Sequence, residues 1–224
     1  EQQPVRTYGR SDGLPGNVVM GPYVDTRHFL WISTRDGLSR FDGVRFTNYD
    51  MTDGLPTAMI NGILETRAGV YWIETNSGAC RLNPRGRRAT SPAGERTPVA
   101  TLSSESEPLF VQYRVGSSSL TNRVNILIED RLGVVWAGTD GGLFRLEASD
   151  RGEEFRAVQL PLVPTDHSAG AVHTAVEDAD GNLWFAADWG LTRLLPDGRP
   201  VMYRLATRGE SGAVTSVMAD EATR

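Results

Sequence analysis

The stretch Asp130-Arg-Leu-Gly133-Val-Val-Trp136-Ala-Gly-Thr139-Asp-Gly-Gly142-Leu143 decides the fold, because versions of it recur four times along the chain. When the copies are aligned on their tryptophans, a glycine follows six residues later and an arginine nine residues later in every copy. A period in the forties with one tryptophan-bearing strand per unit is typical of a β-propeller blade. The four aligned tryptophans are Trp31, Trp72, Trp136 and Trp184.

Each copy carries signals for four short strands. An apolar stretch and a turn precede the tryptophan strand, which is rich in Ile, Val and Thr, and a glycine turn, a short strand and an aromatic segment follow it. The sequence therefore predicts an all-β propeller of four-stranded antiparallel blades, with the four tryptophans buried between blades. The expected blades span about 17–49, 58–115, 122–160 and 170–205.

The two ends of the chain look like pieces of further blades. Residues 5–8 match the outer strand at 46–49, and residues 213–220 match the inner strand of the fourth blade. We expect a fragment of a larger propeller, since an open stack would leave apolar blade faces in water. Such unpaired edges favour association with a second subunit. The alternative is a self-closed ring with a defective fifth blade.

Composition excludes several classes of protein. The net charge is −5 and the arginines are scattered, which argues against a nucleic-acid partner. No apolar run approaches eighteen residues, so we expect no direct membrane insertion by this segment. The single cysteine, Cys80, cannot form an intrachain disulfide and is expected to be a buried small hydrophobe.

Aspartates six residues before the aligned tryptophans raise the question of a metal site. They are isolated, one per blade, and lack the alternating acidic ligands of a calcium loop. We therefore predict that they cap turns by accepting backbone N–H groups, and we expect neither a metal nor a cofactor. These residues are Asp25, Asp130 and Asp178, and Asp220 stands at the matching position of the partial strand at 213–220.

The repeated pattern, preceded by Asp-Gly-Leu-Pro, resembles the two-component regulator propeller repeat over residues 5–220. Trp31-Ile-Ser-Thr34 followed by Gly37-Leu38-Ser-Arg40-Phe matches that repeat most fully, whereas Thr66 and Ala187 depart from it. In that family, such repeats form the periplasmic sensing part of membrane-bound regulators, often hybrid histidine kinases. The resemblance implies a non-catalytic, ligand-sensing segment in the periplasm, with the rest of the receptor as a partner.

Candidate ligand-binding residues lie where the repeat is broken or where the inner strands face the central channel. Trp189, beside Asp188, is the one tryptophan out of register, and we interpret it as an aromatic platform for a sugar or another flat ligand. The alternative is that it caps a neighbouring blade. The equivalent turns and a nearby connection contribute Arg35, Asn76, Asp140 and His167, and the inner strands contribute Asn61, Asn125 and His173.

An insertion is the other break in the repeat. It falls at about 83–108, between the second and third blades, and its Pro, Ser, Glu and Arg content predicts a surface loop. The loop either contacts a partner subunit or is a tolerated excursion.

Three classes of function remain open. A sensor would bind a small molecule or carbohydrate without turnover, and a scaffold would bind protein. A propeller lyase or glycosidase would act near the channel, with His173 as an acid or base. No spacing marks a pair of carboxylates and no nucleophile motif occurs, so the sequence favours the sensor over both alternatives.

Overall fold

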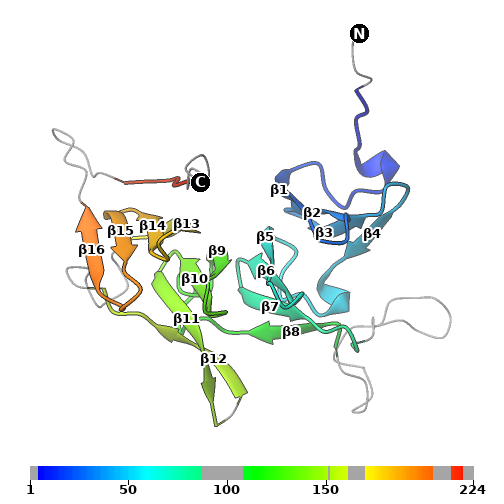
Figure 1. Ribbon diagram of the computed structural model, residues 1–224. Coiled ribbons are helices and arrows are strands. Elements are labelled where there is room, and N and C mark those ends of the chain that lie inside the picture. The colour runs from blue at the N-terminus through cyan, green and yellow to red at the C-terminus, as the bar shows by residue number, and fades with distance from the viewer. Residues whose placement is uncertain (1–4, 87–107, 151, 161–169, 204–212, 219–224) are drawn as a thin grey trace.

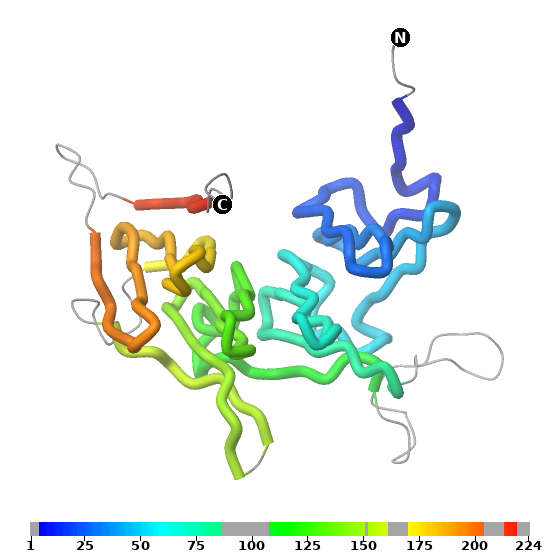
Figure 2. Tube along the Cα trace, in the orientation of Figure 1, coloured from blue at the N-terminus to red at the C-terminus, as the bar shows by residue number. Residues whose placement is uncertain are grey.

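The computed structural model describes residues 5–86, 108–150, 152–160, 170–203 and 213–218. Within these residues, sixteen strands form four antiparallel sheets, each built from four consecutive strands (Figure 1). The chain passes through the sheets in order along an arc (Figure 2). This arrangement confirms the predicted β-propeller of four-stranded blades. Most of the insertion predicted at 83–108 lies outside the described residues.

The strands of each sheet follow the aligned repeat. The first sheet contains β1 (Val19–Val24), β2 (Leu30–Thr34), β3 (Gly37–Phe41) and β4 (Phe46–Tyr49). The second contains β5 (Ile60–Glu65), β6 (Tyr71–Thr75), β7 (Gly78–Leu82) and β8 (Phe110–Tyr113). The third contains β9 (Val124–Glu129), β10 (Val135–Thr139), β11 (Gly142–Ser149) and β12 (Gly152–Ala157). The fourth contains β13 (Val172–Glu177), β14 (Leu183–Ala187), β15 (Gly190–Leu194) and β16 (Pro200–Tyr203).

The hydrophobic core lies between neighbouring sheets. Three aligned tryptophans, Trp31, Trp72 and Trp136, pack against the following sheet and are 1%, 2% and 6% exposed. The prediction that all four are buried is wrong for Trp184, which is half-buried and stacks on Tyr203. The reason is that no following sheet exists among the described residues to cover it.

In three of the four sheets, the turn before the tryptophan strand is held by the predicted capping aspartate, and Thr66 takes its place in the second. In the third sheet, Asp130 Oδ1 accepts the backbone N–H groups of Leu132 and Val134, each at 2.9 Å. Its other oxygen, Oδ2, accepts the indole N–H of Trp136 at 2.9 Å, a bond that the sequence did not reveal. Asp25 and Asp178 repeat the arrangement. Capping is therefore the role of these aspartates.

One of these turns has an unusual backbone. Gly69, Gly133 and Gly181 occupy the left-handed region in the second, third and fourth sheets, with φ of 74°, 85° and 83°. The first sheet places His28 there with φ of 63°. A non-glycine residue with a positive φ is strained.

The partial strands predicted at 5–8 and 213–220 are not strands in the described part of the chain. Tyr8 packs against Phe41 and Phe46 of the first sheet, and Val214 N–H donates to Ala187 O at 3.0 Å. Each segment thus lies against a complete sheet. Among the described residues, neither segment belongs to a β-ladder.

Candidate functional site

The candidate site lies on the connector face, defined as the face formed by the links between sheets and the turns at 35–36, 76–77, 140–141 and 188–189. In three sheets, the predicted inner-strand residue hydrogen-bonds to the predicted turn residue fifteen positions later. The Nδ2 groups of Asn61 and Asn125 donate to Asn76 Oδ1 and Asp140 Oδ1, each at 2.9 Å. The Nε2 atom of His173 lies 2.7 Å from Asp188 Oδ1.

The two asparagines also join neighbouring sheets. Asn61 Nδ2 donates to the carbonyl of Val124, the first residue of β9, at 2.7 Å. Asn125 Nδ2 donates in the same way to Val172 O, at the start of β13, at 3.1 Å. Each amide therefore connects its own turn with the next inner strand. A ligand that bonds to these groups also touches the contact between sheets.

The pair formed by His173 and Asp188 is accessible on the connector face. Burial disfavours ionisation of Asp188, but the N–H of Ala171 at 2.8 Å and the bond from His173 outweigh it and lower the pKa of this carboxyl. The two side chains are 30% and 47% exposed. An accessible imidazole oriented by a carboxylate is suited to binding a polar ligand or to acid–base chemistry.

Trp189 is held against its own sheet. Its Nε1 donates to the buried hydroxyl of Thr192 at 3.0 Å, and its half-buried ring packs against the core between the third and fourth sheets. These contacts fix the position of the ring at the edge of that core. Arg35 is exposed at the equivalent turn of the first sheet, whereas His167 lies outside the described residues.

Three glutamates that the sequence interpretation missed hold the opposite face together. Glu65, Glu129 and Glu177 end the inner strands, seven residues before their tryptophans. Each accepts a backbone N–H from the turn of the preceding sheet: Thr26 at 2.8 Å, Arg67 at 2.7 Å and Arg131 at 3.1 Å. The constant spacing to tryptophan is a signal that could have identified them.

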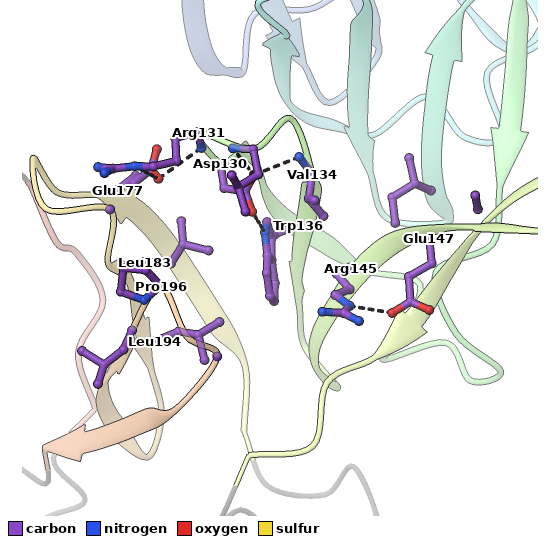
Figure 3. A pocket seen from close by; sticks show the side chains of 16 residues that line it. Asp130, Arg131, Val134, Trp136, Arg145, Glu147, Glu177, Leu183, Leu194 and Pro196 are labelled. Atoms are coloured by element: carbon purple, nitrogen blue, oxygen red, sulfur yellow. Dashed lines mark hydrogen bonds and ion pairs between the residues drawn. The ribbon is translucent and has the colours of Figure 1, made fainter.

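A pocket of about 550 Å³ opens between the third and fourth sheets, beside Trp136 (Figure 3). It lies among turns at the ends of strands opposite the connector face. Leucines, a valine and a proline form much of its wall, and charged side chains stand at its rim. Its lining includes Leu132, Val134, Leu146, Leu183, Leu194, Pro196, Arg131, Arg145, Glu147 and Glu177.

Two further observations limit the chemistry of the described residues. No group of three or more His, Cys, Asp or Glu side chains in this part of the chain is placed to hold a metal ion. No helix within the same residues is long and apolar enough to cross a membrane.

Sequence comparisons return neither a matching protein-family model nor a matching curated protein. Solved structures do match. The extracellular domain of BT4673 from B. thetaiotaomicron, assigned to a one-component system, aligns with a TM-score of 0.65 and 20% identity. That alignment covers 96% of this chain and 25% of the BT4673 structure, so the chain spans a quarter of that neighbour's length.

Two other neighbours differ in biological role. Virginiamycin B lyase from Staphylococcus aureus aligns with a TM-score of 0.59 and 13% identity, covering 89% of this chain and 59% of the lyase. PorZ, a surface component of the type-IX secretion system of Porphyromonas gingivalis, aligns with a TM-score of 0.59 and 18% identity. That alignment covers 89% of this chain and 30% of PorZ. At these identities the likeness shows the propeller fold alone.

Proposed function

We propose that this chain is the ligand-sensing propeller segment of a membrane-bound two-component-type receptor, located in the periplasm and not itself catalytic. The observation that carries the proposal is the connector face, where ligand-accessible polar groups also bond to the next sheet. The resemblance of the repeat to two-component regulator propellers supports it. The extracellular location of the BT4673 domain also supports it.

The contacts suggest how binding would become a signal. Asn125 holds Asp140 of its own sheet and Val172 of the next one at the same time. A ligand that takes one of these bonds changes the free energy of the contact between the two sheets. Binding then shifts the population of sheet arrangements, which is what a sensor passes on to its output domain. The partners in this proposal are a small molecule or carbohydrate, the rest of the receptor and a second subunit.

A binding screen on the complete extracytoplasmic part of the receptor tests the proposal. Thermal-shift measurements against oligosaccharides and short peptides would find a ligand, and calorimetry would give its affinity. We expect Asp188→Asn to weaken binding about tenfold, or about 1.4 kcal/mol, with little change in Tm. Asp150→Asn, at an exposed hairpin tip, is the matched control and should bind normally. Equal affinities of the two variants would reject the connector face as the sensing site.

A propeller lyase is the second candidate, and one observation favours it. The oriented pair of His173 and Asp188 is chemically able to act as a general base. Among the structural neighbours is a virginiamycin B lyase variant with one histidine replaced by alanine, described as catalytically inactive. Turnover of a bound compound that disappears in His173→Ala would establish the lyase. Binding without turnover would reject the lyase and support the sensor.

A further inference from the structure

The interfaces between sheets share a repeated pair of aromatic rings. A tyrosine from one outer strand, or from the segment that precedes the first sheet, meets edge-on a phenylalanine of the next sheet. The ring centroids are 5.4 Å, 5.6 Å and 6.4 Å apart in the three pairs, which are Tyr8 with Phe46, Tyr49 with Phe110, and Tyr113 with Phe155. Because these rings cover the edges of the core, they help to close the space between sheets.

Both rings are missing between the third and fourth sheets. The tyrosine stands three residues after the phenylalanine in the first two outer strands, and Val158 stands three residues after Phe155 in the third. In the fourth sheet, Pro200 pairs with Leu194 at the register position where the other sheets have phenylalanine. This interface therefore has an aliphatic side chain and a proline where the others have two aromatic rings.

The arginine that follows the tryptophan by nine residues is also placed differently at this interface. In the other three sheets, the arginine nine residues after tryptophan lies over the indole, at 5.8 Å for Arg40, 5.7 Å for Arg81 and 5.3 Å for Arg193. In the third sheet, Arg145 Nε instead donates to Glu147 Oε1 at 2.5 Å. Figure 3 shows the bond between Arg145 and Glu147 beside Trp136.

The pocket beside Trp136 lies at the interface that carries these three departures, and Arg145 is part of its lining. Its volume of about 550 Å³ lies within the range of small-molecule sites. Val134, Leu183 and Leu194 supply apolar walls, and the longer β11–β12 hairpin extends one side. At the preceding interface the ring of Tyr113 packs against Trp72, with 4.8 Å between the ring centroids. A ring system is therefore the shape that would replace the missing tyrosine beside Trp136.

The charged side chains at the rim of the pocket indicate whether the ligand itself would be charged. Arg131 is bonded to Glu177, and Arg145 to Glu147, so each guanidinium already has a carboxylate partner. A carboxylate on the ligand would have to displace one of these acids. We propose that the pocket between the third and fourth sheets binds an uncharged aromatic small molecule, at a site separate from the connector face. This inference goes beyond the proposed sensing function and does not depend on it.

Fluorescence titration with N-phenyl-1-naphthylamine tests the inference, because this neutral dye brightens in apolar pockets. The test variant is Val158→Tyr, which restores the ring that the other outer strands carry. We expect one saturable site in the unmodified protein and about tenfold or weaker binding in the variant. Filling the space should also raise Tm. Val44→Tyr adds the same side chain at an exposed turn of the first sheet and should leave binding unchanged.

A second variant and a charged dye test the position of the site and the charge of its ligand separately. Val134→Phe fills the pocket from the turn before β10, so it should also weaken binding if Val158→Tyr fails to fold. Equal dye binding by the unmodified protein and both filled variants would overturn the site. Tighter binding of the sulfonated dye 8-anilinonaphthalene-1-sulfonate would overturn the preference for an uncharged ligand. Asp188→Asn should retain dye binding, because Asp188 lies on the connector face and not in the pocket. A failure of the pocket proposal is therefore distinguishable from a failure of the sensing proposal.

Discussion

Replacing Glu74 by glutamine should remove a pH dependence from the stability of this protein. Glu74 follows Trp72 by two residues and is only 4% exposed between the second and third sheets. Its Oε1 accepts the N–H of Leu127 at 2.8 Å, and Gly62 leaves room for its other oxygen. Burial nevertheless dominates and raises the pKa of this carboxyl from 4.5 to about 8.

The sign and size of the effect follow from proton linkage. Between pH 4.5 and 8, the folded state holds the Glu74 proton whereas the unfolded state has released it. The free energy of unfolding therefore falls as pH rises through this window, by about 1.4 kcal/mol per pH unit. The loss amounts to about 3 kcal/mol at pH 7 and about 5 kcal/mol at pH 8. Below pH 4.5 this group causes no loss.

Urea unfolding at pH 5, 6, 7 and 8 measures the effect. Glu74→Gln keeps an acceptor for Leu127 N–H and has no proton to lose. We expect its advantage over the unmodified protein to grow by about 3 kcal/mol between pH 5 and pH 7. Glu154→Gln, at a carboxyl that is 46% exposed, is the matched control and should follow the unmodified profile. If the profiles of Glu74→Gln and the unmodified protein run parallel, the buried-acid reasoning is refuted.

Two further predictions concern the core and a turn. His28→Gly should stabilise the fold by about 1 kcal/mol in urea unfolding, because glycine adopts the positive φ without strain; a loss of stability would contradict this reason. Cys80 is fully buried and burial raises the pKa of its thiol to about 12, so Ellman's reagent at pH 8 should label it only after unfolding. Rapid labelling of the folded protein would show that the core between the first two sheets opens.

The fold could be predicted because its determinants recur in register. Each aligned tryptophan is accompanied by its own turn and glycine, so each of the four copies predicts a blade independently of the others. The capping function of Asp25 and Asp130 was also predictable, since a lone carboxylate before a tight turn has backbone donors within reach. Burial of Trp184 was predicted wrongly because it depends on a neighbouring sheet and not on the local pattern.

The candidate site was predictable only one residue at a time. The positions of Asn61 and Asn76 each follow from the repeat, but their bond forms at a β-bulge, where Asn61 has no register partner on β6. The pocket beside Trp136 was missed for a different reason. It lies at the interface where rings are absent at Val158 and Pro200, and the effect of an absent side chain depends on which neighbours would have met it.

The two sets of inner-strand contacts have a consequence for how such proteins diversify. Asn125 and Val172 join the third and fourth sheets on the connector face, and Arg131 and Glu177 join them on the other, although this interface has lost its aromatic pair. The joints near the axis thus do not depend on the rings at the periphery. Substitutions in the outer strands can therefore reshape one interface while the inner-strand contacts on both faces remain, which leaves the periphery of the arc free to vary from one interface to the next.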